Sequence, residues 1–169
     1  MWNDTDIPLA YLINFRSYGT WLHGDERGSV DRFHNQYNSP FLPPDRKRLE
    51  HNLRQLSSEI VTLNAKQRES IEDAIRETCI FRKWILRAIN VRTNHVHAVV
   101  SIGAARAERA LNDFKAYATR RMRRNACWHS ERSPWADKGS RRPLWNERSV
   151  ELAVDYVMNR QGGDLPDFD

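Results

Sequence analysis

The sequence predicts an α+β fold in which four antiparallel strands form one sheet, helices cover one face of the sheet, and a further helix closes the chain. Three observations predict this fold. Short segments alternate apolar and polar residues, as half-buried strands do. Longer segments between them have apolar residues three and four positions apart, as amphipathic helices do. Finally, 169 residues with 40% hydrophobic and 29% charged residues suit one globular unit, so we expect residues 1–169 to form a single domain.

The first strand is predicted at residues 9–15, where every second residue is large and apolar. A loop with three glycines follows at residues 17–28, and a stretch containing three prolines then connects it to the next element. In the loop, His23, Asp25 and Glu26 are candidate metal ligands, although single polar residues in a loop are more often solvated.

Two helices are predicted before the second strand. The first spans residues 45–56 and is highly charged. The second spans residues 64–82 and begins with Asn64 and Gln67, which have the spacing of a capping box. One face of this helix carries the residues that we expect to be buried: Ile71, Ala74, Ile75, Thr78 and Cys79.

A hairpin is predicted next, with strands at residues 84–91 and 95–101 and its tip at residues 93–94. His95 and His97 are two residues apart on the second of these strands, so their side chains point to the same face, roughly 7 Å apart along the backbone. Imidazole is the commonest metal ligand in proteins, and two imidazoles on one strand can share a divalent ion. The alternative is that both histidines are polar residues on the solvated face of the sheet.

Two helices and a short strand complete the chain. A helix at residues 104–125 has a buried face consisting of Ala107, Ala110, Leu111, Phe114, Ala118 and Met122. Residues 143–145 supply a short fourth strand, and the last helix begins near Ser149 as N-cap and ends at Gly162–Gly163. This element order is that of a ferredoxin-like sandwich with the histidines on a central strand. The face without helices would suit single-stranded nucleic acid.

Basic residues are concentrated between positions 115 and 142, where nine lysines and arginines face only two acidic residues. Trp128, His129 and Trp135 lie among them and can stack on bases. The pattern favours binding to nucleic acid over a merely solvated basic helix. From charge alone, we expect the following residues to contact the backbone of the nucleic acid: Lys115, Arg120, Arg121, Arg141 and Arg142.

Other features bear on the location of the protein. No apolar run approaches the 18 or more residues of a membrane span, and the N-terminus lacks the pattern of a signal peptide. With only Cys79 and Cys127, a disulfide framework is not expected, and a reducing cytoplasm is the default location.

A His-x-His metal site beside a basic surface suggests chemistry on a phosphodiester, and that chemistry needs a nucleophile. No pair of acidic residues has the spacing of a two-metal hydrolase, whereas the phenol of a tyrosine can attack phosphorus. A phenol has a pKa of about 10, so it needs a metal-activated phosphate or a nearby base. Tyr117 lies at the margin of a buried helix face, and Tyr156 lies beside the apolar stripe of the last helix, formed by Val150, Val154 and Val157. These residues alone support a catalytic and a structural Tyr156 equally.

Four motifs occur in order: Tyr18–Gly28 (YGTWLHGDERG), Asn94–His97 (NHVH), Gly139–Trp145 (GSRRPLW), and Tyr156–Val157 followed by Gln161–Gly162. In these motifs the chain resembles the single-tyrosine HUH transposases of small insertion sequences, and most closely their relatives associated with repetitive extragenic palindromes (REP), the RAYT-like proteins. The resemblance implies a ferredoxin-like endonuclease and strand transferase that acts on single-stranded DNA, often bearing a hairpin.

The resemblance also implies roles for individual residues. His95 and His97 would hold Mg²⁺ or Mn²⁺, and Tyr156 would attack the phosphate to give a 5′-phosphotyrosine link and a free 3′-hydroxyl. In the family a polar residue, often Gln, one turn after the tyrosine completes the metal site. Arg160 and Gln161 follow Tyr156 by four and five residues, which is about 40° and 140° around a helix. We therefore expect Arg160 to contact phosphate, and Gln161 to bind metal only if the helix frays at Gly162.

Several alternatives remain. One alternative is a domesticated or inactive DNA- or RNA-binding protein on the same fold, and another is a metal-dependent phosphodiesterase that uses water. Members of the resembled group are dimers or monomers, and the sequence does not decide between a homodimer and a monomer. For a protein acting on DNA, the expected location is the cytoplasm, in association with the nucleoid, with no contact to a membrane.

Overall fold

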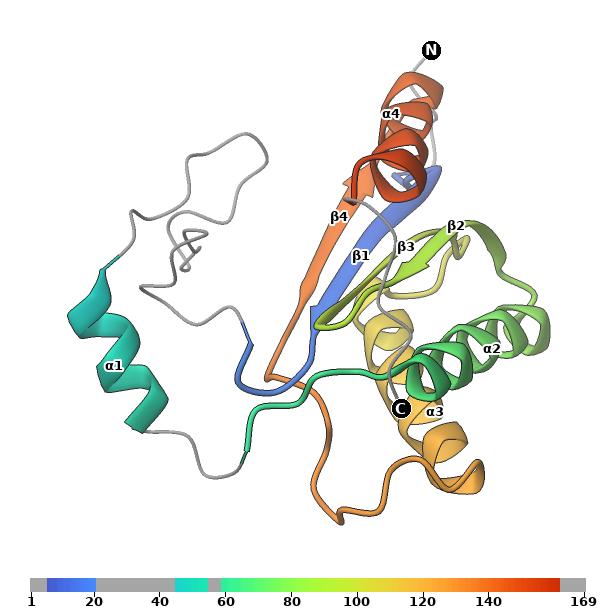
Figure 1. The fold of residues 1–169 in the computed structure, drawn as a ribbon. Coiled ribbons are helices and arrows are strands. Elements are labelled where there is room, and N and C mark those ends of the chain that lie inside the picture. Colours follow the sequence, from blue (N-terminus) through green and yellow to red (C-terminus); the bar gives the residue numbers. More distant parts are fainter. Residues whose placement is uncertain (1–5, 21–44, 55–58, 162–169) are drawn as a thin grey trace.

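The structure is a computed structural model that describes residues 6–20, 45–54 and 59–161 (Figure 1). Its elements, in chain order, are β1 (Ala10–Arg16), α1 (Arg46–Arg54), α2 (Ala65–Arg82), β2 (Ile85–Val91), β3 (His95–Ser101), α3 (Ala107–Arg124), β4 (Ser140–Leu144) and α4 (Glu147–Asn159). Within this part of the chain, no helix is both long and apolar enough to cross a membrane.

The four strands form one antiparallel sheet in the order β2-β3-β1-β4. The two central strands, β1 and β3, pair so that Asn14 lies opposite His97 and Arg16 lies opposite His95. This order and direction are those of the ferredoxin-like sandwich. The fold class predicted from the sequence, with the histidines on a central strand, is confirmed.

Each face of the sheet is covered by different helices (Figure 1). Helices α2 and α3 pack on the face that carries Ile13, Phe15 and Val96, where the larger core lies. Helix α4 packs on the opposite face, against a smaller core that includes Leu12 and Val99. Alternation along each strand separates the two sets of side chains. The second face, expected to be open to nucleic acid, is therefore partly covered by α4.

The local sequence correctly predicted the start of α2 but not the start of α4. At the start of α2, Asn64 Oδ1 accepts from the Gln67 amide at 2.8 Å and Gln67 Oε1 accepts from the Asn64 amide at 2.9 Å, as the capping-box spacing predicted. Helix α4 begins earlier than predicted because Asn146 is its N-cap and its Oδ1 accepts from the Ser149 amide at 2.9 Å. The predicted N-cap, Ser149, is thus inside the helix.

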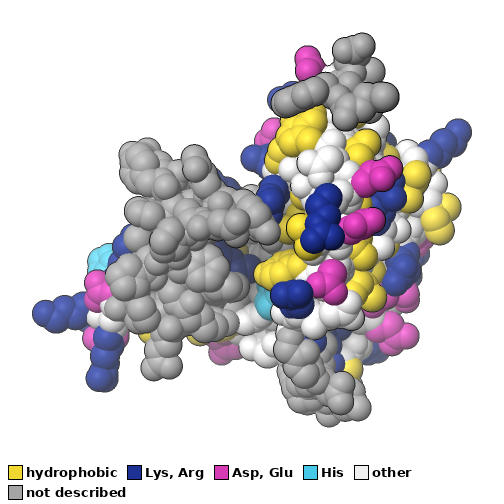
Figure 2. Space-filling view, turned by 90° about the horizontal axis from the view of Figure 1, so that it is seen from above, with side chains coloured by type: hydrophobic (Ala, Val, Ile, Leu, Met, Phe, Trp, Pro, Cys, Tyr) yellow, Lys and Arg dark blue, Asp and Glu magenta, His cyan; other side chains and the backbone are white. Residues whose placement is uncertain are grey.

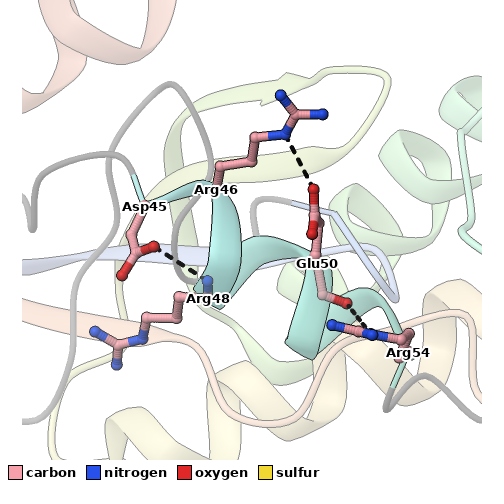
Figure 3. A network of polar contacts seen from close by, with 5 residues as sticks. All are labelled: Asp45, Arg46, Arg48, Glu50 and Arg54. Atoms are coloured by element: carbon pink, nitrogen blue, oxygen red, sulfur yellow. Dashed lines mark hydrogen bonds and ion pairs between the residues drawn. The ribbon is translucent and has the colours of Figure 1, made fainter.

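Helix α1 lies at the surface and is held by contacts between its own polar groups (Figure 3). Asp45 Oδ1 accepts from the Arg48 amide at 3.2 Å, as an N-cap side chain does. Arg46 and Glu50 form an ion pair one turn apart at 3.0 Å, and Arg54 Nε donates to the Glu50 carbonyl at 3.2 Å. The high charge that marked this segment in the sequence therefore stabilises a solvent-facing helix.

Candidate active site

The tip of the β2–β3 hairpin is anchored to the end of β1. The Asn94 carbonyl accepts from the Ser17 amide at 3.0 Å and from the hydroxyls of Ser17 and Thr20, each at 3.3 Å. The Leu63 amide, just before α2, donates to the carbonyl of Thr93 at 2.6 Å. These contacts from two other segments fix the backbone immediately before the histidines.

The histidine rings lie side by side on the face that α4 covers. The ring centroids of His95 and His97 are 4.5 Å apart, with the rings nearly perpendicular. Nδ1 of His95 faces Asn94 Oδ1 at 2.5 Å, and Nδ1 of His97 makes a very short contact with Asn14 Oδ1. Burial, reinforced by the charges of His95 and Arg92, lowers the pKa of His97 to about 3. His97 is therefore neutral at pH 7, the form in which imidazole binds metal.

Helix α4 brings Tyr156 to this pair. The ring of Tyr156 lies 5.6 Å from that of His97, and 41% of the tyrosine surface remains exposed. The helix is held by its buried residues Val150, Ala153 and Val157, and the Val157 carbonyl accepts from Asn90 Nδ2 on β2 at 3.0 Å. The other tyrosine considered from the sequence, Tyr117, lies on α3 in the opposite layer. Tertiary structure thus places only Tyr156 of the two at the histidines.

Gln161 reaches the histidines because α4 ends early. The helix stops at Asn159, and Arg160 has a non-helical conformation (φ −123°, ψ 24°), so the predicted end at Gly162–Gly163 is wrong. Gln161 Nε2 then donates to the Tyr156 carbonyl at 3.0 Å, and its Oε1 lies 3.3 Å from Nε2 of His95. An unbroken helix would have turned Gln161 about 140° from the tyrosine.

The residues at this position suit a divalent metal ion. Two imidazoles and an amide oxygen are ligands that such ions accept. Adjacent ligands of an octahedral ion at about 2.1 Å are about 3 Å apart, close to the 3.3 Å between His95 Nε2 and Gln161 Oε1. Among the described residues, no group of three or more His, Cys, Asp or Glu side chains could hold a metal ion. His95, His97 and Gln161 together could offer two ring nitrogens and one amide oxygen to such an ion.

Three arginines share the sheet face with the histidines. Arg16 lies opposite His95 across β1 and β3, and the Arg92 amide donates to the His95 carbonyl at 2.8 Å. Arg142 on β4 lies opposite Leu12, whose side chain contributes to the core under α4. Sequence reasoning missed Arg16 and Arg92 because they are far from the basic segment in the chain. The strand register places Arg16 beside the histidines, whereas Arg92 precedes His95 by only three residues in the chain.

The residues predicted to contact DNA are divided between the two layers. Arg141, Arg142 and Arg160 lie on β4 or at the end of α4, and Arg160 forms an ion pair with Asp155 at 2.9 Å. Hydrogen bonds from Asn159 and Arg160 lower the pKa of the Asp155 carboxyl, so Asp155 is ionised at neutral pH.

The remaining predicted DNA contacts, Lys115, Arg120 and Arg121, lie on α3 in the other layer. Lys115 Nζ donates to the carbonyls of Ala136 and Lys138, the former at 3.0 Å, and burial lowers its pKa. Arg120 and Arg121 line a groove of about 360 Å³ between α2 and α3. Arg120 stacks over the Tyr117 ring at 5.2 Å, and Arg121 pairs with Glu77.

Figure 2 shows the molecule from the end where α4 lies in Figure 1. Lys and Arg side chains are interspersed there with hydrophobic and acidic ones, and a histidine is visible between them. The loop candidates His23, Asp25 and Glu26 lie outside the described residues, as does the motif Tyr18–Gly28 beyond Thr20.

Comparison with known proteins places the chain in a family. A search of curated proteins found no match. Among solved structures, the chain is similar to that of a REP-associated tyrosine transposase bound to a REP hairpin, with 12% identity, 93% of this chain and 69% of that chain covered, and a TM-score of 0.48. The model of the family described as "Transposase IS200 like" matches residues 56–159, a span that contains both histidines and Tyr156. Since this match covers more than half of the sequence, the chain belongs to the IS200-like transposase family.

Proposed function

We propose that this protein is a metal-dependent single-stranded DNA endonuclease and strand transferase that cuts DNA through a covalent 5′-phosphotyrosine intermediate. The observation that carries the proposal is the meeting of Tyr156 with His97, at 5.6 Å between ring centroids, and of Gln161 with His95 at 3.3 Å. Tyr156 is the nucleophile, and His95, His97 and Gln161 hold Mg²⁺ or Mn²⁺. Membership of the transposase family supports the same reaction class.

The proposed chemistry assigns each group one task. A bound divalent ion supplies the positive charge that offsets the developing charge on the scissile phosphate. The phenolic oxygen of Tyr156, 41% of whose surface is exposed, attacks phosphorus as the bond from phosphorus to the 3′-oxygen breaks. The phenol loses its proton and the departing 3′-oxygen gains one, so no water is consumed. Attack by a 3′-hydroxyl on the phosphotyrosine reverses these bond changes and joins strands.

The proposed DNA path follows the arginines. Arg142 and Arg160 lie on the elements that flank the histidine face. Arg141 lies opposite Ile13, on the other face of β4, and would contact a part of the DNA that passes over that side of the strand. Arg120 and Arg121 would contact a second portion of the substrate, such as the hairpin, along the α2–α3 groove. Lys115 was predicted as a further contact, but its bonds to the Ala136 and Lys138 carbonyls favour a role in supporting the loop before β4.

The decisive experiment is the capture of a protein–DNA adduct. Single-stranded oligonucleotides with a hairpin flanked by randomised sequence are labelled at the 3′ end, because the 5′-phosphotyrosine link retains the 3′ fragment. Incubation with the full chain and Mn²⁺ should give a labelled band at protein size on a denaturing gel. The band should disappear with EDTA and in Tyr156→Phe, and should persist in Tyr117→Phe, whose altered ring lies in the other layer.

Other outcomes identify the alternatives. Cleavage without an adduct would indicate a phosphodiesterase that uses water. Binding without cleavage or adduct would indicate a domesticated DNA-binding protein, and a preference for RNA over DNA of the same sequence would indicate an RNA-binding one. Any of these results would overturn the proposal.

A further inference from the structure

Each histidine of the candidate metal site is matched with one asparagine. Asn14 and His97 lie directly opposite each other on β1 and β3, so their side chains leave the sheet on the same face. Asn14 Oδ1 contacts Nδ1 of His97, and Asn94 Oδ1 lies 2.5 Å from Nδ1 of His95. The two asparagines come from different segments, yet both contact the same ring nitrogen of their histidine.

The contacts of His95 indicate which of its two ring nitrogens carries the proton. Gln161 Nε2 donates to the Tyr156 carbonyl at 3.0 Å, which directs Gln161 Oε1 toward Nε2 of His95. If the side-chain amide of Gln161 were reversed, its Oε1 would face the carbonyl oxygen of Tyr156, and two acceptors would meet. The Tyr156 carbonyl therefore determines the orientation of the Gln161 amide. Nδ1 and Nε2 of His95 therefore both face acceptor oxygens. A neutral imidazole has a single N–H and can donate to only one of them.

We propose that Asn14 and Asn94 are positioning residues that hold His97 and His95 as their Nδ1–H tautomers, so that both Nε2 atoms offer lone pairs to one divalent cation. Metal-binding histidines are commonly oriented in this way by an acceptor at the other ring nitrogen, and loss of the acceptor costs about 10- to 100-fold in metal affinity. The lone pair of His95 Nε2 and the Gln161 oxygen, 3.3 Å apart, then share a cation. The inference rests on the metal-binding role in the proposed function.

Nuclear magnetic resonance of the metal-free full chain tests the tautomers directly. With ¹⁵N-labelled histidine at pH 7.5, long-range ¹H–¹⁵N spectra distinguish a protonated from an unprotonated ring nitrogen. Both His95 and His97 should show a protonated Nδ1 and an unprotonated Nε2. Protonation of His97 at Nε2 in the wild-type chain would overturn the proposal, since Asn14 would then be donating rather than accepting.

Substitutions separate the two asparagines. Asn14→Leu should release His97 into a mixture of tautomers and weaken binding of Mn²⁺ alone, measured by calorimetry, by about 10- to 100-fold. Asn14→Asp retains an acceptor and should keep the tautomer. Should Asn14→Leu not fold, Asn94→Ala provides the same test at His95. The exposed Asn112→Ala on α3 is the control and should change neither spectrum nor affinity. Wild-type tautomer and affinity in both Asn14→Leu and Asn94→Ala would contradict the proposal.

These measurements test the asparagine roles independently of the proposed nuclease function. The tautomers are observed without metal or DNA, so a chain that forms no phosphotyrosine adduct can still confirm the asparagine roles. Conversely, a chain that forms the adduct while His97 carries its proton on Nε2 would refute the asparagine roles and leave the nuclease proposal intact.

Discussion

The ring of Tyr156 lies edge-on to the ring of His97, 5.6 Å from it, although the two residues belong to a helix and a strand that are 59 positions apart in the chain, from 97 to 156. This contact depends on how α4 docks on the sheet. Val157, the next residue along, is fully buried under the helix, and its carbonyl accepts from Asn90 of β2. The packing of Val150, Ala153 and Val157, together with this hydrogen bond, therefore determines the position of the proposed nucleophile.

Loosening this docking should impair both stability and the proposed cleavage. Val157→Ala removes two buried carbons and should lower the free energy of unfolding by about 2 kcal/mol, measured by urea denaturation. The rate of adduct formation should fall as well, because Tyr156 loses its support. Leu152→Ala on the same helix is the control, since Leu152 is 46% exposed and its loss should change stability by less than about 0.5 kcal/mol. Equal effects of the two variants would show that α4 is not held by Val157.

Gln161 and its neighbour Arg160 should differ in their effects on metal binding. Gln161→Ala removes the oxygen that lies 3.3 Å from His95 Nε2 and should weaken Mn²⁺ binding by about tenfold, as judged by calorimetry. Arg160→Ala should leave Mn²⁺ affinity unchanged, because its guanidinium is paired with Asp155. Arg160→Ala should instead lower the affinity for single-stranded DNA, and the remaining affinity should depend less on salt concentration, as judged by binding titrations. Unchanged Mn²⁺ affinity in Gln161→Ala would remove Gln161 from the metal site.

Gly139 should tolerate no side chain. A Cβ at this position would lie 2.7 Å from the Asn14 carbonyl and 3.0 Å from Cδ1 of Leu111. Gly139→Ala should therefore push the start of β4 away from β1, at a cost of about 1–3 kcal/mol in the free energy of unfolding. Because Asn14 also contacts His97, the histidine signals should shift in the same variant. The adjacent exposed Ser140→Ala serves as the comparison and should leave both measurements near wild type.

The two cysteines should differ in reactivity and in their effect on alkaline stability. Burial raises the pKa of Cys79 from 9.0 to about 12, so its thiol stays protonated where an unfolded chain already releases the proton. Stability conferred by the protonated thiol is complete below pH 9 and should be lost as pH rises from 9 to 12. Urea titrations of Cys79→Ala should lack this component. In the native chain at pH 8, iodoacetamide should label the half-buried Cys127 before Cys79; the reverse order would contradict this assignment.

Local patterns in the sequence were sufficient for most of the fold. Alternation predicted the strands, and the spacing of Asn64 and Gln67 predicted the start of α2, because a capping box needs only residues within one turn. The shared face of His95 and His97 followed from the period of a strand. The family was also predictable, since its motifs are short and contiguous in the chain.

The sequence predicted the ends of α4 less well, because more than one residue near each end could cap or terminate the helix. Asn146 and Ser149 are both good N-cap residues, and the structure uses Asn146. The two glycines at 162–163 predicted a later end for α4 than the one observed at Asn159. That difference decides whether Gln161 can approach His95, because the direction of a side chain changes by about 100° with each helical residue.

By itself, the sequence determined the strands and helices, the pairing of the two histidines on one face, and the charge of the chain, since each of these depends on neighbours a few residues away. Only the tertiary structure decided that α4 covers the second face of the sheet, that Tyr156 rather than Tyr117 meets the histidines, and that Asn14 lies opposite His97. Those relationships depend on strand register and on helix docking between distant segments, and periodicity along the chain carries no information about which distant surfaces will pack together.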